Sequence, residues 1–168
     1  ALADADPQVR KAALEHLAHQ TKSKLGRHAL GMAYYAIGDT KDAQGQLQQA
    51  ITDVTDDEPN PLSYHTRTAL ADILLGSGDI KGAGDQLDEA LKTNSGYLPA
   101  LAMQAKVVLK NGEPDRALDL LAPLEKEDGA MTPAANLTLA EALCTHKTNA
   151  TPQDKVDAET VLTSIKDS

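Results

Sequence analysis

A stretch of twenty-four residues occurs twice in this chain, the second time forty residues after the first. Residues 27–50 are RHALGMAYYAIGDTKDAQGQLQQA, and residues 67–90 are RTALADILLGSGDIKGAGDQLDEA. Ten positions carry the same residue in both copies: Arg27/Arg67, Ala29/Ala69, Leu30/Leu70, Gly38/Gly78, Asp39/Asp79, Lys41/Lys81, Ala43/Ala83, Gln46/Gln86, Leu47/Leu87 and Ala50/Ala90. A period of this size indicates an array of similar units, each of which needs a neighbour to bury its apolar face.

Each copy has two halves, which are separated by Gly38 in the first copy and by Gly78 in the second. On both sides of this glycine, apolar residues recur every three or four positions, which is the spacing of an amphipathic helix. In the second halves they are Ala43, Leu47, Ala50 and Ile51, then Ala83, Leu87, Ala90 and Leu91. Because a glycine that follows a helix readily takes the left-handed conformation, each copy predicts two antiparallel helices joined by a tight turn.

Further copies lie on either side of this pair. Residues 100–126 repeat the pattern with Gly112 at the turn, and a divergent fourth unit extends from residue 132 to the end, where two Thr-Pro pairs predict helix starts. Residues 7–20 match the second helix of a unit, so we expect the chain to begin within a repeat of a longer protein. The apolar side chains of that helix would then be partly uncovered and would favour self-association: Val9, Ala13 and Leu17.

Two places interrupt the regular pattern. The stretch TDVTDDEPNPLS at residues 52–63 is acidic and contains two prolines, which predicts a longer loop between the first two full units. Pro123 falls inside the last helix expected for the third unit, and it should bend or shorten that helix because it lacks a backbone N–H.

The composition supports a helical core and excludes some classes of partner. The chain has four Tyr and no Phe or Trp, so Ala, Leu, Ile and Val must fill the core, and β-branched residues are too scattered to predict strands. The net charge of −9 argues against a nucleic-acid-binding protein and against an anionic membrane surface. No apolar run is long enough to predict membrane insertion. The charge and the single cysteine leave the compartment open, cytoplasmic or bacterial periplasmic.

These units resemble the tetratricopeptide repeat, a helix–turn–helix unit of about thirty-four residues. Residues 24–57, 64–97 and 98–131 fit its small and large apolar positions, although Arg27 and Arg67 stand where an aromatic residue is usual, and no unit ends with the usual Pro. The resemblance implies one all-α domain over residues 1–168, a right-handed α-solenoid of antiparallel helix hairpins. Residues 1–23 would hold the second helix of a truncated repeat, and residues 132–168 a divergent C-terminal capping hairpin.

In this family the first helices of the repeats line a concave groove that receives an extended peptide or a helix. Carried over position by position, the groove would be lined by Leu25, His28, Met32, Tyr35, His65, Thr68, Asp72, Met103, Lys106 and Lys110. Tyr35 and Met103 are the best candidates for apolar anchors. Leu25 and Met32 could equally pack against neighbouring helices. The clamp of Lys, Asn and Arg side chains with which some members hold a terminal carboxylate has no counterpart at positions 28, 32, 68 and 72.

Other candidate chemistry is better explained without a site. His16 and His19 lie on one helical face beside Glu15, but no third metal ligand accompanies them, so surface histidines are favoured. The acidic residues 53–58 lack the ligand spacing of a calcium-binding loop. Cys144 lies in an Ala/Leu-rich helix and is expected to be a small core residue. The triplets at Asn136 and Asn149 match a glycosylation acceptor, but such triplets also arise by chance.

We therefore expect a non-catalytic protein-interaction module with no cofactor and no metal, whose partner is a protein or peptide. Two alternatives remain open at this stage. One is an architectural or self-associating segment of a larger repeat protein. The other is the regulatory domain of a larger enzyme.

Overall fold

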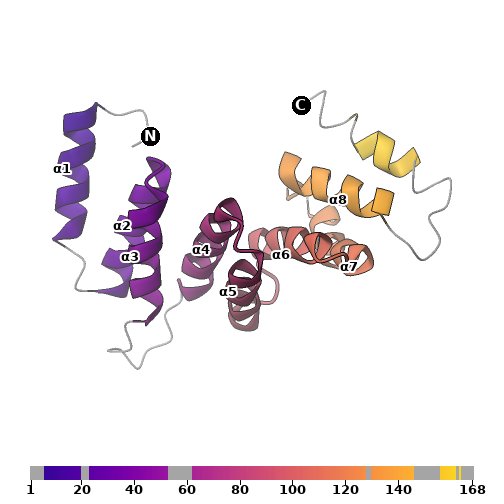
Figure 1. Cartoon of the computed structure of the whole chain (residues 1–168), viewed down its shortest axis with the longest axis horizontal. Coiled ribbons are helices and arrows are strands. Elements are labelled where there is room, and N and C mark those ends of the chain that lie inside the picture. The colour runs from indigo at the N-terminus through magenta and orange to yellow at the C-terminus, as the bar shows by residue number, and fades with distance from the viewer. Residues whose placement is uncertain are drawn as a thin grey trace. The chain divides into compact units, whose positions relative to one another are not determined.

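The computed structural model describes residues 6–19, 23–52, 62–127, 130–145, 156–161 and 163. In this part of the chain every regular element is an α-helix, as Figure 1 shows. The helices are α1 (Pro7–Ala18), α2 (Lys24–Ala36), α3 (Thr40–Thr52), α4 (Ser63–Ser77), α5 (Ile80–Thr93), α6 (Leu98–Lys110), α7 (Pro114–Glu125) and α8 (Pro133–Thr145), and residues 156–161 are also helical. The contacts divide the chain into two compact units, residues 1–93 and 94–168.

The helices pack in adjacent pairs, which confirms the predicted hairpins. In the first unit α2 packs on α3 and α4 on α5, while α3 contacts α4 and α1 contacts α2. In the second unit α6 packs on α7, and α8 contacts both of them. Each helix pair is thus covered in part by a neighbouring helix of its own unit, as a repeat array requires.

The three predicted glycine turns are confirmed and share one geometry. Gly38, Gly78 and Gly112 have φ angles of 82°, 87° and 82°, the left-handed region in which a side chain would be strained. In the first turn the Gly38 N–H donates to the Tyr35 carbonyl at 3.0 Å, and the next N–H donates to the Tyr34 carbonyl, also at 3.0 Å. The same pair of bonds closes α4 and α6, so one helix-ending motif produces all three hairpins.

The aspartate that follows each of the first two turn glycines, Asp39 or Asp79, caps the start of the next helix. The carboxylate of Asp79 accepts from the Gly82 N–H at 2.8 Å, and that of Asp39 accepts from the Asp42 N–H at 3.2 Å. A carboxylate in this position satisfies a backbone donor that the first helical turn leaves free. The Gly-Asp pair therefore ends one helix and starts the following one within three residues.

The core consists of small residues alternating with leucine on the second helices. Ala43, Leu47, Ala83, Leu87, Ala117 and Leu121 are all completely buried. The paired helices α2 and α3 approach closely at Gly31, where an added Cβ would lie 2.7 Å from Leu47 Cγ. Small residues at these crossings let the paired helices come close enough for the leucines to fill the space between them.

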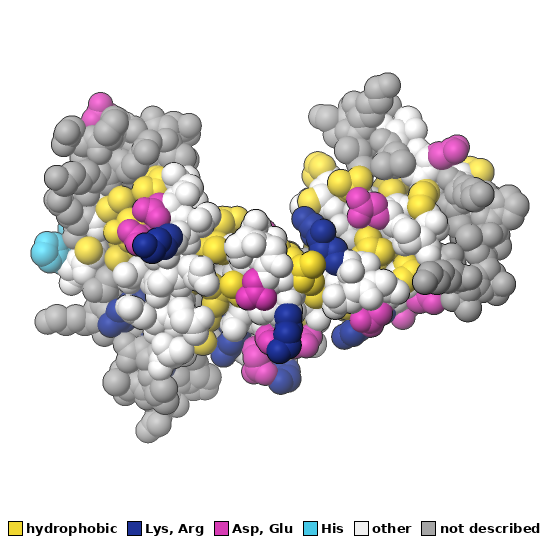
Figure 2. All heavy atoms as spheres, viewed as in Figure 1, with side chains coloured by type: hydrophobic (Ala, Val, Ile, Leu, Met, Phe, Trp, Pro, Cys, Tyr) yellow, Lys and Arg dark blue, Asp and Glu magenta, His cyan; other side chains and the backbone are white. Residues whose placement is uncertain are grey.

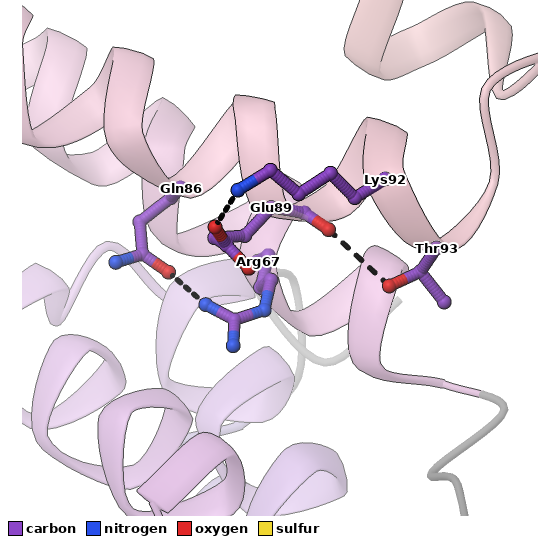
Figure 3. A network of polar contacts seen from close by, with 5 residues as sticks. All are labelled: Arg67, Gln86, Glu89, Lys92 and Thr93. Atoms are coloured by element: carbon purple, nitrogen blue, oxygen red, sulfur yellow. Dashed lines mark hydrogen bonds and ion pairs between the residues drawn. The ribbon is translucent and has the colours of Figure 1, made fainter.

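An arginine replaces the usual aromatic residue at the fourth position of the first two repeats. In the second repeat the Arg67 Nη1 donates to Gln86 Oε1 at 2.8 Å, which joins α4 to α5. Figure 3 shows the Arg67 side chain directed at Gln86, with Glu89 paired to Lys92 beside it. In the first repeat Arg27 donates to Gln49 and joins α2 to α3. Both arginines thus connect the two helices of their own hairpin.

The predicted irregularities have different outcomes. Most of the acidic stretch, residues 53–61, lies outside the described residues. Pro123 is accommodated inside α7, which ends two residues later at Glu125. On α1, Val9 is 59% exposed and Ala13 is half-buried, in line with the expectation of a partly uncovered helix. The side chain of Leu17 lies outside the description.

Candidate partner-binding surface

The ten residues predicted to line the groove fall on three helices. Leu25, His28, Met32 and Tyr35 lie on α2, and His65, Thr68 and Asp72 lie on α4, all in the first unit. Met103, Lys106 and Lys110 lie on α6, in the second unit. Side-chain contacts join the α2 and α4 groups. We call the residues that make them, His28, Tyr35, Thr66 and Asp72, together with His65, whose charge acts on His28, the α2–α4 seam.

Tyr35 and Asp72 form one part of the seam. The Tyr35 hydroxyl donates a hydrogen bond to Asp72 Oδ2. This bond, together with burial of the ring and the negative charge of the carboxylate, raises the pKa of Tyr35 to about 12. The tyrosine expected to anchor a partner therefore uses its polar group inside the chain.

His28 forms the other part of the seam. Its Nδ1 lies 2.9 Å from Thr66 Oγ1, and Thr66 is completely buried on α4. Burial lowers the pKa of His28, and the charge of His65 lowers it further. The ring of His65 in turn lies against that of Tyr64, with 4.3 Å between the ring centroids. Two histidines and a buried hydroxyl thus meet where the first two repeats join.

The remaining first-unit residues differ in their accessibility. Met32 is half-buried and packs against a core cluster that contains Leu47 and Leu70. Thr68 is buried, and its hydroxyl donates to the Tyr64 carbonyl at 2.7 Å, so it offers no polar group to a partner. Leu25 is 60% exposed. In this unit, Leu25 is the predicted groove residue that remains most open to solvent.

The second unit presents its side chains differently. On α6, Met103 is half-buried while Lys106 and Lys110 are exposed one helical turn apart. Among the described residues, neither lysine has an ion-pair partner. Their ammonium groups are therefore available to a charged group from outside the described chain.

Sequence reasoning missed three residues on α8. Leu137 is 48% exposed, and Glu141 and Cys144 are also exposed. Their spacing of four and then three residues places them on one helical face. It is the same spacing as that of His28, Met32 and Tyr35, so extending the repeat pattern into the divergent fourth unit would have found them. Together with Met103, Lys106 and Lys110 we call them the α6–α8 face.

The exposure of Cys144 corrects the expectation that it is a core residue. Cys144 lies near the end of α8 and is exposed to solvent. The residues that α8 buries include Ala135, Leu139 and Ala142. The triplet at Asn136 lies within α8, and its Thr138 is buried with the hydroxyl bonded to the Ala134 carbonyl at 3.0 Å. The folded helix therefore makes this triplet a poor glycosylation acceptor. Asn149 lies outside the described residues.

Other kinds of site find no support in the described part of the chain. No group of three or more His, Cys, Asp and Glu side chains there is placed to hold a metal ion. His16 and His19 are exposed at the end of α1. Of the helices that the structure describes, none combines the length and the apolar character needed to cross a bilayer.

Comparison with known proteins agrees with the repeat pattern. A family model described as tetratricopeptide repeat matches residues 28–99, and a second model of the same description matches residues 74–141. A comparison with curated proteins gives no match. The two matched regions together extend from α2 into α8 and include all three glycine turns. The chain therefore belongs to the tetratricopeptide repeat family.

Proposed function

We propose that this chain is a protein-interaction module that binds an extended peptide or a helix of its partner, and that the α6–α8 face is its principal contact surface. Tetratricopeptide repeats are generally protein-interaction modules. The observation that carries the choice of surface is the exposure of Leu137 and Glu141 on one face of α8 and of Lys106 and Lys110 on α6, a helix that α8 contacts. Figure 2 shows hydrophobic, basic and acidic side chains interspersed over α6 and α8.

The first-unit face is a weaker candidate. Its polar groups are already engaged, because Tyr35 bonds to Asp72 and His28 contacts Thr66. A partner that binds here would have to break these bonds. If it left them intact, it would contact little more than Leu25. Interactions that replace an existing hydrogen bond yield little net free energy, so this face offers fewer unused contacts.

The chemistry of the α6–α8 face suggests the kind of segment that it binds. Met103 and Leu137 supply apolar contacts, and the thioether adapts to irregular partner shapes. Lys106 and Lys110 favour a carboxylate, whereas Glu141 disfavours a segment that carries only negative charge. We therefore expect a partner segment with apolar side chains and charges of both signs.

Capture experiments with matched variants test the proposal. The full chain carrying Met103→Ala and Leu137→Ala should capture its partner at least about tenfold more weakly, since anchors of this kind each contribute on the order of 1–2 kcal/mol. The control is Val9→Ala, which removes an exposed apolar side chain from α1 instead. If the double variant binds as strongly as the control, the α6–α8 face is not the contact surface.

The groove predicted from the sequence makes a different prediction in the same experiment. If the first-unit face carries the binding, the Tyr35→Ala variant should lose capture, while the Met103→Ala, Leu137→Ala double variant should keep it. Circular dichroism of every variant establishes that the helices are intact. Loss of capture in the Tyr35 variant alone would move the proposed site to the α2–α4 seam.

Self-association through α1 is a second candidate, favoured by the 59% exposure of Val9. An apolar side chain left open on a helix can be covered by a second copy of the chain. Sedimentation of the full chain should then show a concentration-dependent increase in mass, which Val9→Asp abolishes. A constant monomeric mass over the whole concentration range excludes this candidate.

A further inference from the structure

The hydrogen bonds around Thr66 determine how the His28 ring is held. Thr66 Oγ1 lies 3.0 Å from the Leu62 carbonyl and 2.9 Å from His28 Nδ1. The side chain is completely buried on α4, so water does not compete for the hydroxyl. Through this hydroxyl, Thr66 on α4 makes a polar contact with His28 on α2.

The hydroxyl has a single proton, so it can donate either to the Leu62 carbonyl or to His28 Nδ1, and this choice sets the tautomer of the ring. Its donation to the Leu62 carbonyl, one helical turn earlier, follows the usual habit of threonine within a helix. Oγ1 is then left as an acceptor, so His28 Nδ1 must carry a hydrogen and donate it. Nε2 is consequently the unprotonated nitrogen of the neutral ring, and it is the atom that takes up a proton on acidification.

The electrostatic surroundings of His28 oppose that second proton. Next to α2, the described charged or titratable side chains are His16 on α1, Lys41 and Asp42 on α3, and Tyr64, His65, Arg67 and Asp72 on α4, while α2 itself carries Lys24, Arg27, Tyr34 and Tyr35. Of these, His65 is the one whose charge lowers the pKa of His28, and burial of the ring lowers it more. Asp72, the carboxylate of the seam, is engaged by the Tyr35 hydroxyl.

We propose that the α2–α4 seam is a pH-sensitive joint between the first two repeats, held closed while His28 is neutral and loosened when His28 becomes positively charged. This property goes beyond partner binding and belongs to the free chain. Protonation of His28 places a positive charge at a half-buried position where the charge of His65 opposes it, and separation of α2 from α4 relieves both this opposition and the lost hydration.

The direction of the pH effect follows from linkage. The pKa of His28 is lower in the closed seam than in an opened one, where it returns to about 6.5. The opened state therefore binds more protons as the pH falls. The stability that the neutral ring gives to the seam is fully present above about pH 6.5 and is lost as the pH falls through the lower pKa of the closed seam.

Nuclear magnetic resonance of the full chain tests the tautomer and the titration directly. The imidazole nitrogen shifts of His28 should show hydrogen on Nδ1 at neutral pH, and its titration midpoint should lie below the ordinary histidine value of about 6.5. The His65→Asn variant should raise the midpoint of His28. Hydrogen on Nε2, or a midpoint that lies at about 6.5 and does not move in the variant, overturns the proposal.

A pair of threonine variants provides the matched control. Thr66 and Thr68 are both buried on α4, and each hydroxyl bonds to the carbonyl four residues earlier, but only Thr66 contacts His28. Thr66→Val should therefore shift the titration midpoint and ring signals of His28, whereas Thr68→Val should leave them unchanged. Equal effects of the two variants would overturn the assigned contact.

Amide hydrogen exchange of the unmodified chain tests the opening without relying on any variant. After correction for the intrinsic rate, protection of α2 and α4 should fall between pH 7.5 and pH 5, while that of α6 and α7 changes less. The His28→Asn chain should show a smaller pH effect in α2 and α4. Protection of these helices that is the same at both pH values overturns the proposal.

Discussion

Two glycine substitutions in the same hairpin should change stability in opposite directions. Gly31 lies in the middle of α2 and Gly45 in the middle of α3. A Cβ built on Gly31 lies 2.7 Å from Leu47 Cγ, 2.8 Å from Leu47 Cδ2 and 3.2 Å from the Leu47 backbone N, whereas a Cβ on Gly45 has no neighbour within 4 Å. The two glycines thus occupy similar positions in their helices but differ in the free space around an added Cβ.

The magnitudes follow from two separate effects. Alanine is favoured over glycine in a helix interior by about 0.5–1 kcal/mol, so Gly45→Ala should stabilise the chain by this amount. Gly31→Ala gains the same helix-propensity stabilisation, but its methyl group must displace the completely buried Leu47. Overpacking of this kind costs roughly 1–3 kcal/mol of stability. The difference between the two variants therefore isolates the overpacking cost, and Gly31→Ala should be net destabilising.

Urea unfolding followed by circular dichroism measures both changes on the full chain. Repeating Gly31→Ala in a Leu47→Ala background supplies a further test, because the added methyl then enters the space left by the leucine. In that background Gly31→Ala should stabilise, as Gly45→Ala does. A Gly31→Ala chain as stable as the Gly45→Ala chain would show that α2 and α3 do not approach closely at this point.

Other variants test the turns, the seam and the core. Asp79→Ala should cost about 0.5–2 kcal/mol because it removes the cap at the start of α5, as measured by urea unfolding against Ser77→Ala, whose hydroxyl bonds at the exposed end of α4. Ultraviolet titration should find that Tyr35 ionises near pH 12, and the Asp72→Asn variant should return this ionisation toward pH 10. The stability that the Tyr35 hydrogen bond contributes should be complete below pH 10 and lost by about pH 12. Ala83→Leu should destabilise by roughly 1–3 kcal/mol in the same unfolding assay, and a neutral result would mean that the second repeat is out of phase.

The repeat predicted the hairpins because its signals are local. A glycine followed by an aspartate ends one helix and caps the next through bonds that span five residues or fewer, so the sequence contains all the groups involved. The alternation of Ala43 with Leu47 likewise predicts a buried face without knowledge of the opposing helix. Both features are confirmed in the structure, where these side chains are completely buried.

The seam could not be predicted in the same way. Tyr35 and Asp72 are separated by thirty-seven residues, and the periodic pattern places each on its helix face without determining which side chains meet. The equivalent residues of the next repeats do not repeat the pair, so no second copy indicated the contact. Cys144 illustrates a related limit, because the apolar character of α8 predicts a buried helix, whereas the spacing from Leu137 and Glu141 determines that this cysteine is exposed.

The two arginines show how one substitution between repeats changes a local contact. Gln46 and Gln49 of α3 correspond to Gln86 and Glu89 of α5, so each arginine has two acceptor positions one turn apart. In the second repeat Lys92 pairs with Glu89, as Figure 3 shows, and its bond and charge are the main cause of the lowered pKa of Glu89. Arg67 therefore bonds to Gln86.

The first repeat has Thr52 in place of Lys92, and this difference accounts for the other arrangement. With no lysine at that position to occupy Gln49, Arg27 bonds to Gln49 instead of Gln46. Within the described part of the chain, the buried Oε1 of Gln46 then accepts no hydrogen bond. Because an arginine stem also covers apolar surface, the position usually held by an aromatic residue can be filled by a polar side chain whose partner depends on its neighbours. The hairpin is retained in both cases because the glycine turn and the Ala–Leu crossing, which are identical in the two repeats, determine it.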